Sequence, residues 1–295
     1  MGDTVALSAA RAGTVKLGDF EVNRLGFGAM RITGQGIWGQ PADPLAARDL
    51  LKRAVALQIN FIDTADAYGP EVSENLIRQA LAPYDQYPGL VIATKGGMTR
   101  SGPGMWGKNG RPGHLREACE DSLKRLGVKQ IQLYQFHRPD PDVPFEDSVQ
   151  ALVDLQSEGK IKHIGLSNVT LKQLKEAQSM ATIVSVQNHY NLEHRKASEP
   201  VLQYCQEQGI VFIPYFPIGG NQGGMAEVKV QTIADKYGIS GRQVALAWLL
   251  KHSPVTLPIP GTSSVEHLES NIASANVELS STDMATLDSL SDLQK

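Results

Sequence analysis

Cysteine is nearly absent from this chain. Only Cys119 and Cys205 occur among its 295 residues. Two thiols so far apart in the sequence are too few for a disulfide framework or a zinc site, and they suit a reducing compartment. The sequence therefore predicts two buried, unpaired thiols.

The chain also lacks an excess of charge and a long apolar run. It carries 28 lysines and arginines against 31 aspartates and glutamates, a formal net charge of -3, without a dense basic segment. Nucleic acid is therefore not expected as a partner. No stretch approaches the roughly 20 apolar residues that span a bilayer, and residues 1–18 lack the apolar core of a signal peptide. We expect a cytoplasmic protein with no membrane partner.

No linker divides the sequence. Its length of 295 residues by itself allows either two domains of about 150 residues or one large barrel of about 250. Strand-like and helix-like segments instead alternate along most of the chain, a rhythm typical of a parallel sheet. We therefore expect a single domain over residues 1–295.

Eight short apolar runs, each followed by a segment with helical spacing, predict an α/β fold of the (β/α)8 TIM-barrel type. The predicted strands span residues 24–28, 61–64, 90–95, 132–137, 162–167, 183–188, 210–215 and 256–259. The predicted helices span residues 44–57, 71–82, 113–126, 146–158, 170–179, 198–208, 241–251 and 264–274.

Segments outside this repeat predict additions to the barrel. Residues 15–22, with Gly18 and Asp19 at their centre, predict an N-terminal β-hairpin that plugs the barrel floor. Residues 226–237 and 280–291 predict two extra helices. The glycine-rich segments 33–40 and 96–113 predict loops, and loops that follow barrel strands carry binding residues.

Polar residues follow the predicted strands at the end where such a barrel builds its active site. An isolated charged residue at a strand end is more often solvated, but an acid, an ammonium and an imidazole buried together need mutual pairing. Tyr68 lies five positions after Asp63, in a loop short enough to reach the same mouth. The strand-end residues are Asp63, Lys95, His137, Ser167, Asn168, Gln187, Asn188 and Tyr215.

All of these residues except Tyr215 lie in segments that resemble signatures of the aldo-keto reductase family, and six such segments occur in the family's order. The resemblance covers nearly the whole chain and is strongest to bacterial oxidoreductases linked to broad aldehyde reduction. The segments are Asp63-Thr-Ala-Asp-Ala-Tyr-Gly69, Ala93-Thr-Lys95, Gln135-Phe-His137, Ile164-Gly-Leu-Ser-Asn168, Val186-Gln-Asn188 and Ile259-Pro-Gly-Thr262.

The resemblance implies a barrel that reduces aldehydes or ketones to alcohols with NADPH. It gives Tyr68 the role of proton donor, tuned by Lys95 and Asp63, and has His137 orient the carbonyl. Hydride transfer to a carbonyl carbon leaves an alkoxide, which needs a proton. An ammonium about 4 Å from a phenol contributes about 4 kcal/mol at an effective dielectric of about 20. We therefore expect Lys95 to lower the pKa of Tyr68, by about three units.

The resemblance also implies a cofactor site. Tyr215 is expected to stack on the nicotinamide ring. The amide of the nicotinamide would be held by Ser167, Asn168 and Gln187. The predicted cofactor residues are Gly28, Ala29, Met30, Asp63, Ser167, Asn168, Gln187, Tyr215, Phe216, Pro217, Ile218, Gly219, Gly220, Gly261, Thr262, Ser263, His267 and Asn271.

One part of this set departs from the commonest family pattern. Many members carry a lysine at the position of Gly261 and an arginine at that of His267, near the adenosine 2′-phosphate. A neutral imidazole binds phosphate more weakly than a guanidinium. NADPH is still expected over NADH, and an ordinary helix cap at Ser264 is the alternative explanation of this segment.

The glycine pattern Gly34-Gln-Gly-Ile-Trp-Gly39 does not predict a dinucleotide fold, because it does not lead from a strand directly into a helix. We interpret it as a loop in which Trp38 is a candidate wall of the substrate pocket. Trp106, Tyr68 and His137 are the other predicted substrate contacts. His189 and His194 lack the spacing and partners of metal ligands, so no metal is expected.

Two other functions stay open. Some barrels that resemble this family serve ion channels, so the chain could be a regulatory protein that senses a nucleotide without turnover. A lyase could instead use Lys95 as a Schiff-base nucleophile. Taken singly, Tyr68, Lys95 and His137 could be a turn tyrosine, a flexible cation and a strand histidine. The complete set favours a reductase whose partner is a small carbonyl compound.

Overall fold

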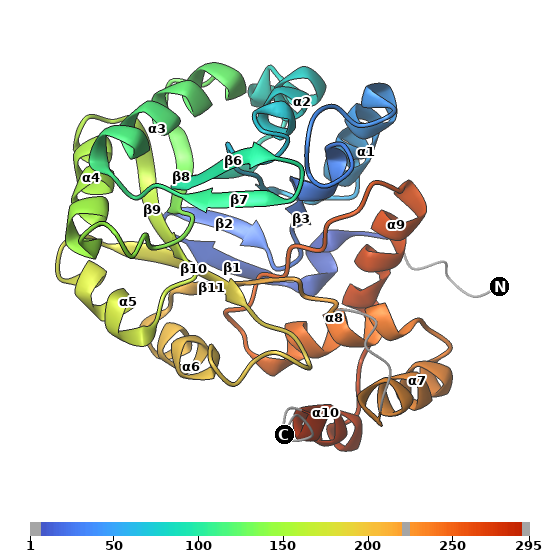
Figure 1. The fold of residues 1–295 in the computed structure, drawn as a ribbon. Coiled ribbons are helices and arrows are strands. Elements are labelled where there is room, and N and C mark those ends of the chain that lie inside the picture. Colours follow the sequence, from blue (N-terminus) through green and yellow to red (C-terminus); the bar gives the residue numbers. More distant parts are fainter. Residues whose placement is uncertain (1–6, 220–224, 291–295) are drawn as a thin grey trace.

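Parallel strands curl around one axis and form most of a barrel (Figure 1). In the computed structural model, which describes residues 7–219 and 225–290, seven strands pair in the order β11-β10-β9-β8-β5-β4-β3. These strands are β3 (Phe27–Gly28), β4 (Phe61–Asp63), β5 (Val91–Gly96), β8 (Ile131–Phe136), β9 (Ile161–Ser167), β10 (Ile183–His189) and β11 (Val211–Tyr215).

The predicted eighth strand, 256–259, closes the barrel without forming a regular strand. Thr256 forms an isolated parallel bridge with Phe212 of β11. On the other side, the N–H of Gly26 donates to the carbonyl of Pro258 at 3.0 Å. Prolines at 258 and 260 cannot donate to a ladder, which explains why the pairing is so short. The prediction of a (β/α)8 barrel is confirmed, with one irregular strand.

Helices surround the sheet on its outer face (Figure 1). Each barrel helix lies within one residue of its predicted bounds. Side-chain caps explain several of these starts: Asp43 accepts hydrogen bonds from the first turn of α1, and Thr170 and Ser240 form capping boxes. The helices are α1 (Pro44–Ala56), α2 (Val72–Leu81), α3 (Pro112–Leu126), α4 (Phe145–Ser157), α5 (Leu171–Gln178), α6 (Glu199–Gln208), α8 (Gly241–His252) and α9 (Val265–Ala273).

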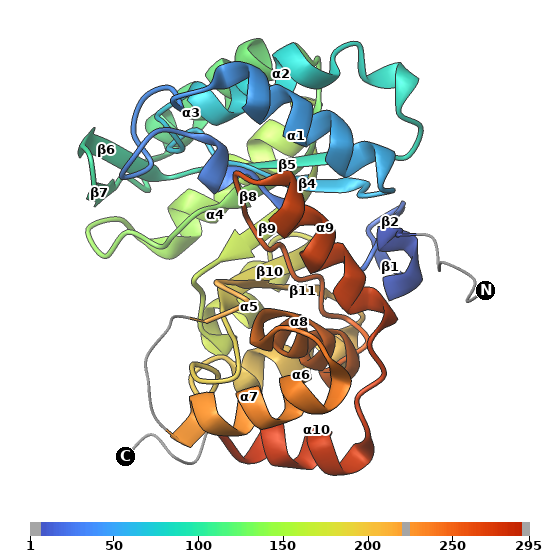
Figure 2. The same cartoon turned by 90° about the vertical axis from the view of Figure 1, so that its right-hand side faces the viewer.

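The two predicted extra helices are α7 (Met225–Tyr237) and α10 (Ser281–Asp288). They lie together beyond α8 (Figure 2), and Lys236 pairs with Asp283 across them at 2.8 Å. Short 3-10 turns are η1 (Ala9–Ala12), η2 (Ala29–Ile32), η3 (Tyr84–Gln86) and η4 (Ser274–Asn276). Among the helices of the described residues, none is long and apolar enough to cross a membrane.

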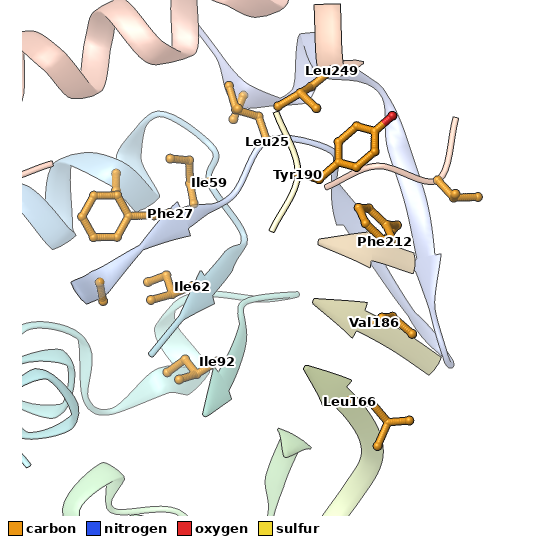
Figure 3. Packing of buried hydrophobic residues seen from close by; sticks show 14 of the residues in the cluster. Leu25, Phe27, Ile59, Ile62, Ile92, Leu166, Val186, Tyr190, Phe212 and Leu249 are labelled. Carbon is orange, nitrogen blue, oxygen red and sulfur yellow. The ribbon is translucent and has the colours of Figure 1, made fainter. Parts of the chain in front are cut away.

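Alternate residues of each strand pack on opposite faces of the sheet. The outward set joins the helices in one buried layer, in which Figure 3 labels Ile62, Ile92, Leu166, Val186 and Phe212. The inward set forms a second cluster inside the barrel, which includes Phe61, Val91, Ala93, Leu133, Val211, Ile213 and Leu257. Cys119 and Cys205 are buried and unpaired in the outer layer, as predicted.

The predicted N-terminal hairpin consists of β1 (Thr14–Leu17) and β2 (Phe20–Asn23). Its turn uses Gly18, whose φ of 62° lies in the left-handed region. Leu17 and Val22 are fully buried and belong to the cluster inside the barrel. The hairpin therefore plugs the barrel floor, as the sequence predicts.

The prediction that residues 96–113 form only a loop is wrong. This segment contains a second antiparallel hairpin, β6 (Met98–Gly102) and β7 (Met105–Lys108). Pro103 and Gly104, the latter at φ 70°, make a tight turn that the general glycine content obscured. The two hairpins lie at opposite ends of the barrel (Figure 2). The other predicted loop, 33–40, contains no described helix or regular strand.

Leu17→Ala should destabilise the fold without altering the opposite end of the barrel. Truncating a leucine with no exposed surface costs about 2–5 kcal/mol. Urea unfolding of this variant measures the loss, and the exposed neighbour Lys16→Ala is the matched control. An unfolding free energy unchanged by Leu17→Ala would contradict the floor assignment.

Candidate functional site

The inward-facing residues change from apolar to polar toward the carboxyl ends of the strands. Val91 and Ala93 precede Lys95 on β5, and Phe61 precedes Asp63 on β4. Parallel strands end at one rim, so the polar ends of these rows meet there. The resulting site lies directly above the apolar interior.

Lys95 is the centre of this site. Its Nζ donates to Asp63 Oδ2 at 2.6 Å, to the Thr64 carbonyl at 3.0 Å and to the Tyr68 hydroxyl at 3.4 Å. Lys95 is 0%, Asp63 1% and Tyr68 7% exposed. All three protons of the ammonium are thus used in a buried position. The predicted acid, cation and phenol lie in direct contact.

Two amides complete the surroundings of Asp63. Gln135 and Gln187 each donate from Nε2 to Asp63 Oδ1 at 2.9 Å. Gly165 leaves room for Gln135, since a Cβ there would lie 2.9 Å from Gln135 Cγ. Gln135 was not among the predicted site residues. Its place two residues before His137, on the same inward row of β8, is the sequence signal that identifies it.

The expected lowering of the Tyr68 pKa is wrong for this structure. Burial of the phenol raises its pKa by more than the nearby Lys95 lowers it, and Asp63 adds to the rise. Burial also opposes the charge on Lys95, but Asp63 and Tyr68 outweigh that effect and raise the Lys95 pKa. The ammonium is therefore held charged, and the phenol keeps its proton at neutral pH.

His137 completes the predicted catalytic set. Its ring lies edge-on to Tyr68, with centroids 5.9 Å apart, and is 7% exposed. Burial, together with the charges of Lys95 and Arg138, places the His137 pKa well below its ordinary value. The imidazole is therefore neutral at pH 7. Its Nδ1 is buried without a hydrogen-bond partner among the described residues.

Asn168 joins three strand ends at the rim. It has a left-handed backbone, φ 60°, which asparagine tolerates better than most residues. Its Nδ2 donates to the His137 carbonyl and to Ser167 Oγ, each at 3.0 Å, and its Oδ1 accepts the Tyr215 hydroxyl at 2.8 Å. The predicted residues Ser167, Asn168 and Tyr215 are thus brought together, whereas Gln187 points its amide at Asp63.

Aromatic rings support Tyr215 from behind. His189 stacks on Tyr215 with centroids 5.2 Å apart, and His194 stacks on His189 at 4.9 Å. Within residues 7–219 and 225–290, no group of three His, Cys, Asp or Glu side chains could hold a metal ion.

Asn188 fixes the loop after β9, because its side chain both donates to and accepts from the Val169 backbone.

The segment after β11 continues from Tyr215 along the rim. Phe216 has a φ of 51° and is half exposed, and its carbonyl accepts hydrogen bonds from Asn191 Nδ2 at 2.9 Å and from the N–H of Gly219 at 3.0 Å. This turn holds Pro217 and Ile218 in place. Gly220, also a predicted cofactor residue, lies outside the described residues.

Gly28 and Gly261 are required by close packing of the backbone. A Cβ at Gly28 would lie 2.6 Å from the Ile259 carbonyl, and one at Gly261 would lie 2.7 Å from the Gly28 carbonyl. The end of β3, where Ala29 and Met30 begin η2, therefore touches the segment that closes the barrel. A side chain at position 261 would therefore collide with the Gly28 backbone in this structure.

The start of α9 is both capped and accessible. Ser264 accepts from the His267 N–H, and Thr262 Oγ1 accepts from the Ser264 N–H at 3.0 Å. The ordinary cap considered for this segment is therefore present. Ser263 and His267 remain exposed beside it, and Asn271 is buried one turn further along the helix.

Arg100 contacts two tryptophan rings and several backbone carbonyls at the mouth of the barrel. Its guanidinium lies 3.7 Å from the Trp106 ring centroid and 5.6 Å from that of Trp38. Trp106 in turn contacts Tyr68 edge-on. All N–H groups of Arg100 donate to backbone carbonyls, which belong to Gly36, Ile37, Ala67, Gly102 and Met105. The sequence carried no signal for this role, because the acceptors come from three separate loops.

Comparisons with known proteins find relatives over nearly the whole chain. A model described as the aldo/keto reductase family matches residues 24–292. The chain is 51% identical to an uncharacterized oxidoreductase of Schizosaccharomyces pombe, with 96% of this chain and 91% of that protein covered. It is 42% identical to pyridoxine 4-dehydrogenase of Escherichia coli, with 94% and 98% covered.

Solved structures of aldo-keto reductases have a similar fold over nearly the whole chain. A thermostable aldo-keto reductase crystallised with an inhibitor has a TM-score of 0.81 and 31% identity, with 94% of this chain and 99% of that chain covered. An aldo-keto reductase of Klebsiella pneumoniae in complex with NADPH has a TM-score of 0.78 and 26% identity, with 94% of both chains covered.

Lys95→Met should destabilise the protein strongly, because it leaves the Asp63 carboxylate buried without its cation. Removing one partner of such a pair costs about 3–5 kcal/mol, and Asp63→Asn combined with Lys95→Met should cost less than the sum of the single changes. Urea unfolding at pH 7 measures this cycle. Lys124→Met, which breaks an exposed pair with Asp121, is the control and should change little. If the losses of unfolding free energy in the two single variants add up to the loss in the double variant, Lys95 and Asp63 are not coupled.

Proposed function

Because the chain belongs to the aldo/keto reductase family, we propose that it reduces aldehydes or ketones to alcohols with NADPH, using Tyr68 as the proton donor. The observation that carries this proposal is the buried contact of Lys95 with both Asp63 and Tyr68, beside a neutral His137. One barrel domain over residues 1–295 would contain the whole activity, and we propose the cytoplasm, where unpaired thiols are stable, as its location.

The proton moves from Tyr68 Oη to the oxygen of the carbonyl. A phenol with a raised pKa holds its proton in the ground state, and it donates when negative charge develops on the substrate oxygen. The hydrogen bond from Lys95 stabilises the phenolate that remains. Asp63 fixes the ammonium in that position, and Gln135 and Gln187 hold Asp63.

His137 orients the substrate oxygen. Its Nδ1 is buried without a hydrogen-bond partner among the described residues, and in the proposed reaction the neutral ring donates a proton from Nε2 in a hydrogen bond to the carbonyl. Arg100 packs on the rings of Trp38 and Trp106, and Trp106 contacts Tyr68, so we propose both tryptophans as walls of the substrate pocket.

The described residues fit a nicotinamide dinucleotide. Tyr215 presents a ring held from behind by His189, and Ser167 and Asn168 offer a hydroxyl and an amide beside it. The turn at Phe216–Gly219 would follow the pyrophosphate, and the exposed start of α9, with Ser263 and His267, would meet the adenosine phosphate. When bound, NADPH supplies the hydride.

The name of one relative narrows the substrate. The Escherichia coli protein that is 42% identical to this chain is a pyridoxine 4-dehydrogenase. We propose pyridoxal, the aldehyde that corresponds to pyridoxine, as a substrate of this chain among other small carbonyl compounds. Consumption of NADPH with pyridoxal and with simple aldehydes is the direct assay.

The alternatives have less support. A lyase needs an unprotonated lysine, but Lys95 is held charged by Asp63 and fully buried. A regulatory barrel that only senses a nucleotide has no need of the buried acid, cation, phenol and imidazole gathered here. Turnover with a carbonyl compound separates the reductase from both.

Tyr68→Phe should reduce kcat for carbonyl reduction by about 100-fold to 10,000-fold, because it removes the proton donor. Binding of NADPH, followed by quenching of tryptophan fluorescence, should persist. Tyr204→Phe, which loses only a hydroxyl bonded to Gln178, is the matched control. Wild-type turnover in Tyr68→Phe would refute the donor role. NADPH binding by the wild-type chain without turnover of any carbonyl would support the regulatory alternative.

The wild-type chain should have a lower KM for NADPH than for NADH, and His267→Arg should widen this difference by about tenfold. A guanidinium forms charge-assisted hydrogen bonds to phosphate that a neutral imidazole does not. The KM for NADH in the same variant is the internal control, because NADH lacks the 2′-phosphate. A lower wild-type KM for NADH would contradict the proposed phosphate site.

A further inference from the structure

Arg138 is a half-buried cation at the rim that the mechanism above does not use. It directly follows His137 at the carboxyl end of β8. Its Nη2 donates to Asn168 Oδ1 at 2.9 Å, the same oxygen that accepts the Tyr215 hydroxyl. Its guanidinium therefore lies between the proposed substrate-orienting residue and the proposed nicotinamide contacts.

Within residues 7–219 and 225–290, the charge of Arg138 has no counter-ion. Among the described residues, no carboxylate lies within 4.0 Å of its guanidinium, and its Nε is buried without a hydrogen-bond partner. Asp140, the acidic residue nearest in sequence, is occupied by the backbone N–H groups of Gly110 and Asp142. Among the residues that the structure describes, the side-chain partners of Arg138 are the Asn168 amide oxygen and the Tyr215 hydroxyl, and both are neutral.

Three other cations that are buried or partly buried have their partners within the protein. Lys95 is balanced by Asp63 at 2.6 Å, and Arg125 by the buried Glu74 at 2.5 Å. Arg100 places every N–H on a carbonyl oxygen, so it has no donor left for a ligand. Of these four cations, Arg138 is the one that the described residues leave with both an unpaired charge and an unused donor, its Nε.

A cation removed from water without an anion is costly, so an unpaired guanidinium at a ligand site indicates that the ligand brings the anion. The anionic groups of the dinucleotide have other proposed contacts, at Phe216–Gly219 and at the start of α9. The nicotinamide itself carries no negative charge. The remaining source of an anion beside His137 is the substrate.

We propose that Arg138 binds a negatively charged oxygen of the substrate, so that the pocket prefers carbonyl compounds that carry a carboxylate, a phosphate or an ionised hydroxyl near the reacting carbon. This inference rests on the proposed reductase function and names its substrate class. Pyridoxal has this character, because its ring hydroxyl lies next to the aldehyde. A planar fork of donors suits carboxylate and phosphate oxygens in particular.

The test compares aldehydes that differ only in charge. The kcat/KM values of the wild-type chain, Arg138→Gln and Arg138→Lys are measured with 3- and 4-formylbenzoate and with their neutral methyl esters. In Arg138→Gln the ratio of kcat/KM for the better acid to that for its ester should fall by about 10-fold to 100-fold, the size of a lost charge-assisted hydrogen bond. Arg138→Lys should restore part of the ratio. Arg111→Gln, which removes an exposed arginine, should leave it unchanged.

Equal losses of kcat/KM for the acid and the ester in Arg138→Gln would overturn the proposal. A rise in the KM for NADPH with an unchanged ratio of the acid and ester kcat/KM values would also overturn it. Calorimetric binding of 4-(hydroxymethyl)benzoate and of its methyl ester gives a second measurement that needs no turnover. Weaker binding of the acid alone in Arg138→Gln supports the proposal, and unchanged binding overturns it. Absence of turnover with every aldehyde counts against the proposed function, while the calorimetry still decides the role of Arg138.

Discussion

The buried ion pair of Lys95 and Asp63 is the constraint on which the site depends. Such a pair is stable only when its remaining protons and lone pairs are satisfied. Here Thr64 and Tyr68 take the other two protons of the ammonium, and Gln135 and Gln187 fill the second oxygen of the carboxylate. These partners come from β4, β5, β8, β10 and the loop after β4. The charged centre and the closed barrel therefore require each other.

Around this centre, the rim is held by groups that each join several chain segments. Asn168 links the ends of β8, β9 and β11, and Arg100 links three loops through backbone carbonyls. Tyr215 is backed by His189 and His194. Side chains fixed in this way need little rearrangement when a ligand arrives, which is how a preorganised site stabilises developing charge. Arg138 differs from them because its charge is left for a ligand.

The features that depend on local periodicity could be predicted from the sequence. Alternation of residues along each strand separates the outer layer, with Ile62 and Ile92, from the inward rows that end in Asp63 and Lys95. The helical spacing and caps located all eight barrel helices to within one residue. The N-terminal hairpin follows from the same local rules. The residues at the rim could be identified as strand ends by the same pattern, because parallel strands of a barrel end at one edge.

Only the tertiary structure determined the pKa shifts, the long-range hydrogen bonds and the close packing, because each depends on residues that lie far apart in the chain. The Tyr68 pKa rises rather than falls because burial and Asp63 outweigh Lys95, and no spacing in the sequence gives that balance. The roles of Gln135 and Arg100, and the contact that requires glycine at 261, likewise depend on segments that meet only when the barrel closes. Sequence periodicity fixes which face a side chain takes, whereas desolvation, charge balance and close packing depend on three-dimensional distances.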